Sequence, residues 1–237
     1  MADTFASEEQ DISITIPADG AKLQGNLNIP AGARGLVLFA HGSGSSRHSP
    51  RNRYVASALQ EGGLATLLMD LLTPEEESID QRTGQLRFDI GLLAERLVAA
   101  TDWLHENPET RDLKLGYFGA STGAGAALVA AARRPDAIGA VVSRGGRPDL
   151  ARSALPAVRA PTLLIVGGDD LPVIGMNREA LRALEVEKRL EIVPGATHLF
   201  EEPGTLEQVA RLARAWFERH LARTPAQETQ QGAPSGG

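Results

Sequence analysis

Short, continuous apolar runs alternate with helical patterns along most of the chain, and this alternation constrains the fold more than any other feature. The runs cover residues 36–40, 65–69, 113–118, 138–142, 162–166 and 190–193. Unbroken apolar runs of this length favour strands buried on both faces, as in a parallel sheet. Two earlier segments, 11–16 and 23–29, alternate polar and apolar residues, and Asp19-Gly20 between them is typical of a hairpin turn. We therefore expect an antiparallel pair followed by a parallel set.

Helical patterns fall between the apolar runs. We expect helices over residues 54–61, 89–107, 122–134, 177–184 and 205–221. Repeated strand–helix units after a leading hairpin predict an α/β fold, with a mostly parallel, doubly wound sheet of eight strands and helices on both faces. Active sites in such sheets lie at the carboxyl ends of the strands, so the residues that follow each apolar run are the candidates for function.

The two ends of the chain differ in composition from the rest. Residues 1–9 are polar and show no periodicity, and we expect a flexible N-terminus there. Residues 222–237 form a low-complexity segment without an apolar stripe, and we expect a disordered C-terminal tail. No linker interrupts residues 10–221, which we interpret as a single domain.

Charge and composition exclude several classes of function. The 237 residues include 24 Lys and Arg against 30 Asp and Glu, a formal net charge of −6, and they contain no basic tract, so nucleic-acid binding is not expected. The absence of Cys excludes disulfides, thiolate metal sites and a Cys nucleophile. The first ten residues lack the apolar core of a signal peptide, and no apolar run approaches the ~20 residues of a membrane span. We expect a cytoplasmic monomer or homodimer without membrane association.

A G-x-S-x-G sequence, Gly119 to Gly123, follows the buried run 113–118 and precedes an Ala-rich helical segment. The string alone is a weak signal, but this place between strand and helix is where the nucleophile elbow of a hydrolase belongs. There the serine, Ser121, must adopt a strained backbone conformation, and small neighbouring residues relieve the crowding. The alternative is a Gly-rich helix start with Ser121 as its N-cap.

A glycine-rich turn, His41 to Ser46, follows the run 36–40. Such a turn can aim a backbone N–H at the negative charge that develops on a carbonyl oxygen during nucleophilic attack. We predict the amides of Ser43 and Thr122 as the donors of this oxyanion hole. The alternatives are a flexible loop or a phosphate cradle. The phosphate interpretation needs G-x-G-x-x-G or a Walker lysine, and neither is present.

A serine hydroxyl needs a general base at neutral pH, and five histidines are available. His198 lies just past the last predicted strand, in a loop that can reach the elbow, and it is the predicted base. His48, in the loop after the third strand, is the second candidate. We expect a structural hydrogen-bonding role for His41 and surface positions for His105 and His220.

The carboxylate that orients the imidazole belongs after the penultimate strand of the sheet. There the run 162–166 leads into the sequence Gly-Gly-Asp169-Asp170. The residues alone leave both aspartates open as the third member of a triad. Either of them can alternatively cap the helix that follows.

Together these residues resemble the α/β-hydrolase superfamily, whose members carry nucleophile, acid and histidine in the chain order of Ser121, Asp170 and His198. The similarity is to the small, lidless dienelactone-hydrolase-like branch and spans residues 11–221. The segment before Leu171 is similar to the family's G-G-x-D motif, which implies Asp170 as the acid. The resemblance implies acyl transfer to water, with no metal or organic cofactor. Dienelactone hydrolases carry a Cys nucleophile, so Ser121 favours ordinary ester or thioester chemistry.

Four further residues are predicted to contact the substrate: Arg47, His48, Arg144 and Phe200. Because the guanidinium group matches a carboxylate in geometry, arginines gathered at the mouth of the site favour an acidic ester. The alternative is that Glu75, Glu76, Glu77 and Asp80, which follow the fourth strand, neutralise these arginines. The segment 144–160 after the sixth run is too short for a lid domain, which predicts an open site and small soluble esters.

The predicted function is therefore a serine hydrolase that cleaves small-molecule carboxylic esters through a Ser-His-Asp triad and an acyl-enzyme intermediate. Thioester, lactone or peptide hydrolysis on the same triad is an alternative. So is a catalytically silent scaffold that binds a ligand or partner.

Overall fold

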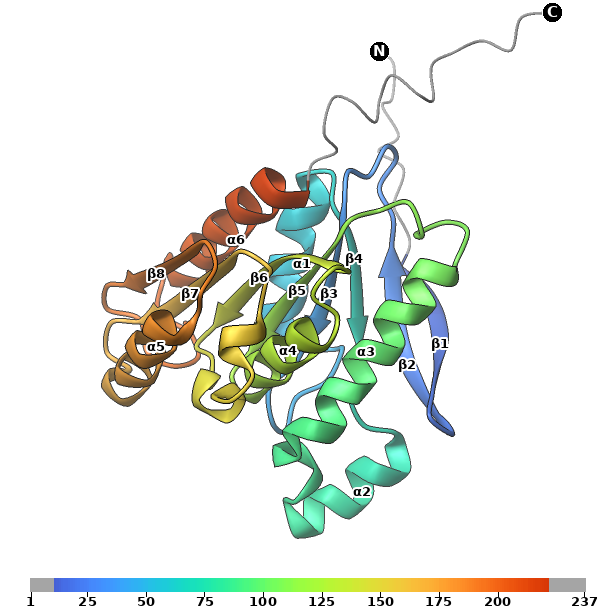
Figure 1. The fold of residues 1–237 in the computed structure, drawn as a ribbon, viewed down its shortest axis with the longest axis horizontal. Coiled ribbons are helices and arrows are strands. Elements are labelled where there is room, and N and C mark those ends of the chain that lie inside the picture. The colour runs from blue at the N-terminus through green and yellow to red at the C-terminus, as the bar shows by residue number, and fades with distance from the viewer. Residues whose placement is uncertain (1–10, 222–237) are drawn as a thin grey trace, which may run out of the picture.

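The computed structural model describes residues 11–221, and the predicted flexible N-terminus and C-terminal tail lie outside the described residues. Eight strands form one sheet (Figure 1): β1 Ile12–Ala18, β2 Ala21–Asn28, β3 Leu36–Ala40, β4 Ala65–Met69, β5 Leu115–Ala120, β6 Ile138–Arg144, β7 Thr162–Gly167 and β8 Lys188–Val193. Their spatial order is β1-β2-β4-β3-β5-β6-β7-β8. β2 pairs antiparallel with β1 and β4, and all other pairs are parallel. The predicted eight-stranded, mostly parallel α/β-hydrolase fold is confirmed.

The unbroken apolar runs arise because both faces of the sheet are covered. In β3, Leu36, Leu38 and Ala40 belong to the apolar core on one face. Val37 and Phe39 belong to the core on the other face. All five residues are at most 1% exposed, so a polar side chain at any of these positions would need a buried hydrogen-bond partner.

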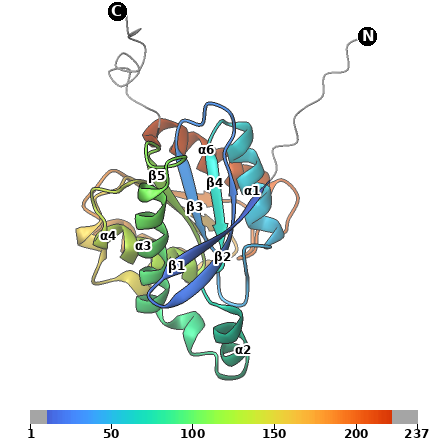
Figure 2. The same ribbon diagram turned by 90° about the vertical axis from the view of Figure 1, so that its right-hand side faces the viewer.

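Residues 11–221 contain six α-helices, of which all but α2 cover the faces of the sheet: α1 Pro50–Glu61, α2 Pro74–Thr83, α3 Ile90–Glu106, α4 Thr122–Arg133, α5 Leu171–Ala183 and α6 Thr205–Leu221. Helices α1 and α6 lie together on one face, and α3, α4 and α5 lie on the other (Figures 1 and 2). Helices α1 and α5 begin four and six residues earlier than predicted (50 against 54, and 171 against 177). Both start with a Pro in the first turn, a signal of a helix N-terminus.

Helix α2 was not predicted from the sequence, because it lacks an apolar stripe. It projects beyond the carboxyl edge of the sheet (Figures 1 and 2) and is stabilised by polar contacts. Thr73 and Glu76 form a reciprocal capping box at its start. The buried carboxylate of Asp80 accepts hydrogen bonds from the backbone and the side chain of Arg87. Glu76 pairs with Arg96, so these acidic groups do not neutralise the arginines predicted at the site.

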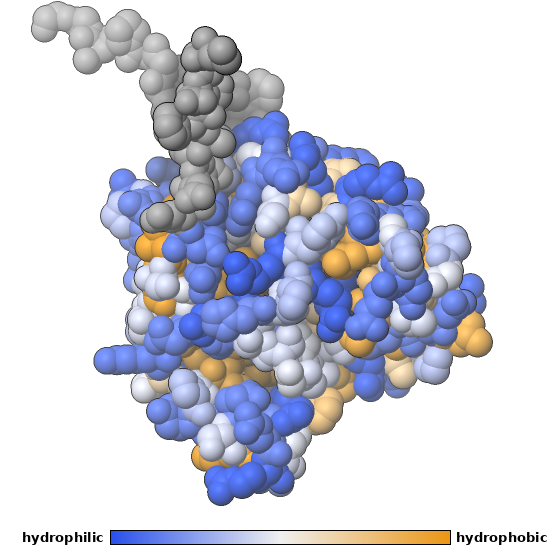
Figure 3. Space-filling view, turned by 180° about the vertical axis from the view of Figure 1, so that it is seen from behind, coloured by the Kyte–Doolittle hydropathy of each residue, from blue (hydrophilic) through white to orange (hydrophobic). Residues whose placement is uncertain are grey.

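The connection from β6 to β7 contains two short 3₁₀ turns, η2 Pro148–Ala151 and η3 Leu155–Ala157. Within residues 11–221, no separate cap domain covers the carboxyl edge of the sheet. None of the helices in this part of the chain is long and apolar enough to cross a membrane. The face seen in Figure 3 is mainly hydrophilic, with small, scattered apolar patches.

Candidate active site

Ser121 stands at a sharp turn between β5 and α4, with φ 50° and ψ −120°. This conformation lies outside the regions that non-glycine residues favour, which indicates stored strain. The turn also requires glycine on both sides. A Cβ atom on Gly119 would lie 2.4 Å from Cα of Ala124, and one on Gly123 would lie 2.3 Å from the carbonyl oxygen of Ala40. The Ser121 side chain makes no capping bond, so the N-cap alternative fails.

The structure brings the three predicted triad residues together. Nε2 of His198 lies 3.3 Å from Oγ of Ser121, and Nδ1 of His198 lies 2.6 Å from Oδ2 of Asp170. An ionised carboxylate can only accept a hydrogen bond. Nδ1 therefore carries the ring proton of the neutral imidazole, and this N–H donates a hydrogen bond to Asp170. Nε2 is then left with a lone pair facing the Ser121 hydroxyl, which is the arrangement that a general base requires.

The structure also separates the two neighbouring aspartates. Asp170 occupies the N-cap position of α5, yet its side chain makes no capping bond and is directed to His198. The backbone N–H of Asp169 donates to the carbonyl of Ala196 at 3.0 Å, which fixes the aspartate turn against the loop that carries His198.

The loop from β8 to α6 presents His198 through a tight backbone path. Gly195 has φ 69° and Phe200 has φ 56°. Between them, the backbone N–H and the hydroxyl of Thr197 donate to the two carboxylate oxygens of Glu202, at 3.0 and 2.6 Å. These bonds hold the pKa of the Glu202 carboxyl below its usual value. The loop is therefore braced on both sides of the imidazole.

The predicted oxyanion turn lies directly against the elbow. The hydroxyls of Ser43 and Thr122 are 2.9 Å apart and share a hydrogen bond. A Cβ atom on Gly42 would come within 3.2 Å of Cβ of Ser121. Neither the Ser43 nor the Thr122 backbone N–H has a hydrogen-bond partner in the described part of the chain. Both amides are thus free to bind a substrate oxygen.

His41 has the hydrogen-bonding role expected for it. Its Nε2 accepts the backbone N–H of Leu71 at 3.1 Å, and its Nδ1 lies 2.9 Å from the carbonyl oxygen of Gly42. A ring nitrogen that accepts a hydrogen bond from an N–H is unprotonated. In the neutral ring Nδ1 therefore carries the proton, and its N–H donates a hydrogen bond to the carbonyl oxygen of Gly42. Burial lowers the pKa of this imidazole, against the opposing effect of Asp70. His41 thereby ties the oxyanion turn to the loop after β4.

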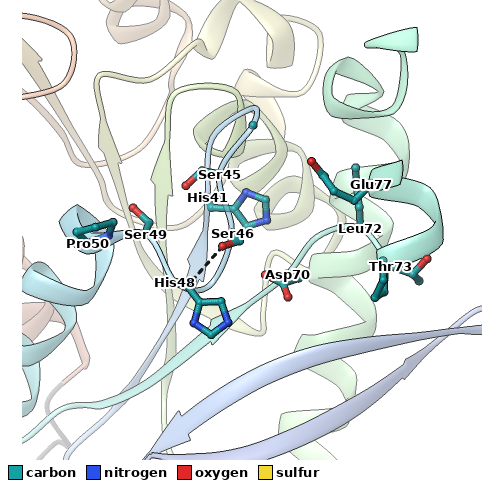
Figure 4. Close-up of a pocket in the computed structure, with 12 residues that line it drawn as sticks. His41, Ser45, Ser46, His48, Ser49, Pro50, Asp70, Leu72, Thr73 and Glu77 are labelled. Atoms are coloured by element: carbon teal, nitrogen blue, oxygen red, sulfur yellow. Dashed lines mark hydrogen bonds between the residues drawn. The ribbon is translucent and has the colours of Figure 1, made fainter. Parts of the chain in front are cut away.

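Two cavities flank the oxyanion turn. The smaller one, about 180 Å³, is lined by Gly42, Ser43, Ser45, Ser49, Arg51, Asn52, Ala120, Ser121, Arg144, His198 and Leu199. The larger one, about 460 Å³, is lined by His41, Gly44, Ser45, Ser46, His48, Ser49, Pro50, Asp70, Leu72, Thr73, Pro74 and Glu77 (Figure 4). Ser45 and Ser49 belong to both linings, so the cavities are neighbours. Only the smaller one contains the nucleophile and the base.

The four predicted substrate contacts occupy different places. Arg144 lines the smaller cavity, with its guanidinium 5.9 Å from the centre of the Phe200 ring, and Phe200 itself is buried. His48 lines the larger cavity (Figure 4). Arg47 is ion-paired with Asp70 and also donates to Asn26 at 3.0 Å, and it lines neither of these two cavities.

The smaller cavity also contains residues without a role in the sequence prediction, among them Asn52, Ser49 and Leu199. Asn52 is 2% exposed and lies in the first turn of α1. The sequence signal that could have placed Asn52 near the site is Ser49-Pro50, an N-cap residue followed by a proline in the first turn of the helix. That signal places the start of α1 beside the site, although it does not show which side chains face inward.

The model of the dienelactone hydrolase family matches residues 23–222, a range that contains the elbow, the oxyanion turn and both aspartates. The chain belongs to the dienelactone hydrolase family. The crystal structure of a dienelactone hydrolase from Anabaena variabilis shares 69% identity with this family member at a TM-score of 0.88, over 90% of this chain and 98% of that chain.

Further comparisons give the fold and the extent of the match. A lidless α/β serine hydrolase from Xanthomonas campestris covers 91% of this chain and 97% of that chain, at 21% identity and a TM-score of 0.70, which supports the fold alone. A Mycobacterium tuberculosis protein provisionally named a phosphoribosyl transferase is 58% identical over 212 residues, 90% of this chain and 47% of that protein. The chain thus spans about half the length of the curated relatives it matches.

Proposed function

We propose that this member of the dienelactone hydrolase family is a serine hydrolase that cleaves small carboxylic esters. The observation that carries the proposal is the position of His198, whose two ring nitrogens lie 3.3 Å from Ser121 Oγ and 2.6 Å from Asp170 Oδ2. Family membership supports hydrolysis, and the elbow serine supports an acyl-enzyme rather than attack by a bound water.

The proposed reaction uses the three triad side chains and the two amides of the oxyanion hole. His198 Nε2 takes the proton of the Ser121 hydroxyl as Oγ attacks the ester carbonyl. The oxyanion that forms accepts hydrogen bonds from the amides of Ser43 and Thr122. The imidazolium, stabilised by Asp170, then protonates the leaving alcohol, and the acyl group stays on Ser121. Water, deprotonated by His198, attacks the acyl-enzyme, and the imidazolium returns this proton to Ser121 Oγ as the bond between Oγ and the acyl carbon breaks and the acid is released.

The size of the smaller cavity supports small substrates. About 180 Å³ admits only a compact group beside the nucleophile, and its openings are not covered by a cap within residues 11–221. Thioester, lactone or peptide bonds can use the same groups, because all four reactions pass through an oxyanion on the attacked carbonyl. The relative that carries the transferase name is matched over 47% of its length, so that name does not assign an activity to this chain.

A fluorophosphonate probe tests the proposal directly. Mass spectrometry should find one adduct on the peptide that contains Ser121, and Ser121→Ala should carry none. The same variant should lower kcat for 4-nitrophenyl butyrate on the order of 10⁶-fold. A wild-type protein that neither reacts with the probe nor hydrolyses 4-nitrophenyl butyrate or other 4-nitrophenyl esters would be a silent scaffold, contrary to the proposal.

A further inference from the structure

Arg144 is a buried charge without an acidic partner. Its exposed fraction is 7%, and within the described residues it forms no ion pair and its Nε has no hydrogen-bond partner. The one polar contact of its side chain in this part of the protein is a 3.5 Å approach of Nη2 to Oδ1 of Asn52, at the limit of a hydrogen bond, and the guanidinium also faces the Phe200 ring. A guanidinium withdrawn from water in this way costs free energy that the protein itself does not recover.

A second guanidinium adds to the positive charge. Arg51, in the first turn of α1, lines the same cavity, and its Nε likewise lacks a partner among residues 11–221. It is held by Glu201 at 3.2 Å on the more exposed side of the molecule. Burial, and then repulsion by Arg51, lowers the pKa of Arg144 to about 10, so the Arg144 guanidinium is still cationic at neutral pH.

The remaining wall of the cavity offers no carboxylate to Arg144. Its lining, taken over the described residues, contains no Asp or Glu. Helix α1 points its N-terminus to this wall and has no acidic residue in its first turn, so its dipole adds positive potential. The neighbouring larger cavity is different, because Asp70 and Glu77 line it. Of these two cavities, the one that holds the nucleophile is therefore the one with a positive lining.

We propose that the smaller cavity binds a second, anionic group of the ester substrate, a carboxylate or a phosphate, with Arg144 as its main ligand and Arg51 as its second. The inference rests on the proposed function. Ser121 and Arg144 line the same cavity, and the backbone N–H of Ser121 donates to the backbone carbonyl of Arg144 at 3.2 Å, so the nucleophile and the anion ligand are neighbours. The anionic group is accordingly separated from the ester carbonyl by only a few bonds.

Matched ester pairs test the proposal. On the acyl side, 4-nitrophenyl hydrogen adipate and 4-nitrophenyl 5-phosphonopentanoate are compared with neutral 4-nitrophenyl hexanoate. On the alcohol side, 4-acetoxybenzoate is compared with its neutral methyl ester. We expect kcat/KM to be about 10- to 100-fold higher for an anionic member of at least one pair, as a charge-assisted hydrogen bond provides. The two acyl-side anions show whether carboxylate or phosphate is preferred.

Variants assign the preference to the arginines. Arg144→Gln should reduce the anionic-to-neutral ratio of kcat/KM by about 10-fold or more, and Arg144→Lys should retain part of it. Arg159→Gln is the matched control, because it removes the same charge from an exposed pair with Asp136, outside this cavity. That control should leave the ratio unchanged. Fluorophosphonate labelling of each variant confirms that the nucleophile is still active.

Two results would overturn the inference and leave the proposed function standing. One is normal labelling of Ser121 with no anionic preference in any pair. The other is a loss of rate in Arg144→Gln that is equal for anionic and neutral esters, which would mean that Arg144 only positions the His198 loop through Phe200. Absence of labelling in the wild-type protein would instead contradict the proposed function itself.

Discussion

Oδ2 of Asp170 lies 2.6 Å from Nδ1 of His198, whereas the adjacent Asp169 makes its hydrogen bond through the backbone, to Ala196. Two consecutive residues of the same type thus have different partners. If the residues of this turn were shifted by one position, Asp169 instead of Asp170 would face the imidazole of His198. The pair therefore provides a variant and its own matched control.

We expect Asp170→Asn to lower kcat for 4-nitrophenyl butyrate by about 10⁴-fold, because an amide favours the wrong tautomer of His198 and cannot stabilise the imidazolium. Asp169→Asn should change kcat by less than about 10-fold, since the amide preserves the backbone bond to Ala196 and the side chain does not contact the ring. Steady-state kinetics of the two variants checks this. Equal losses would contradict the assignment of Asp170.

The two glycines Gly123 and Gly175 predict opposite effects of the same substitution. Gly123→Ala places a Cβ 2.3 Å from the carbonyl oxygen of Ala40, and we expect a loss of about 1–3 kcal/mol or more in unfolding free energy. Gly175 lies in α5, and a methyl group added there would meet no described atom within 4 Å apart from its chain neighbours and the backbone of its own helix, so Gly175→Ala should gain about 0.5–1 kcal/mol from helix propensity. Urea denaturation monitored by circular dichroism measures both. A neutral Gly123→Ala would show that the elbow can relax.

His41 should make stability depend on pH. Its pKa is lowered in the folded protein, so above the ordinary value of about 6.5 neither state binds the proton and there is no effect. As the pH falls below that value, the unfolded chain takes up the proton while the folded protein does not, and stability declines until the folded pKa is reached. Unfolding free energies at roughly pH 8 and pH 5.5 should therefore differ more in the wild-type protein than in His41→Gln, whose amide can replace both hydrogen bonds without titrating. Identical differences in the two proteins would argue against a neutral His41.

The narrow cavity beside Ser121 predicts a preference for short acyl chains. With about 180 Å³ available, 4-nitrophenyl acetate and butyrate should have higher kcat/KM than the dodecanoate, measured below the micelle-forming concentration of the long ester. An optimum at long chains would show that the acyl group leaves this cavity for another surface. The comparison uses one leaving group throughout, so it reports the acyl side alone.

The sheet was predictable from the sequence because its strands are covered on both faces. In β3 each of the five residues packs into one of the two apolar cores, and the sequence of the strand is therefore an unbroken apolar run. Helix α2 was missed for the opposite reason: Thr73 and Glu76 stabilise it locally, and no apolar stripe marks it. Polar capping gives a weaker signal than periodic burial.

The order of Ser121, Asp170 and His198 along the chain followed from a resemblance, and their distances required the structure. The arginines illustrate the limit. Arg47 and Arg144 looked equivalent in the sequence, yet Arg47 is paired with Asp70 and Arg144 has no acidic partner in the described part of the chain. Which arginine keeps its charge free depends on contacts between distant segments, and residue type alone does not encode them.

The crowding around Gly119 and Gly123 has a practical consequence for protein engineering. In a random library spread evenly over the gene, we expect most clones with a substitution at Gly119 or Gly123 to be misfolded, because even one added methyl group collides with main-chain atoms there. A focused library that leaves these two glycines untouched and varies Arg51, Asn52 and Leu199 would sample the wall facing the nucleophile instead. Altered selectivity should then be found without first rescuing folding.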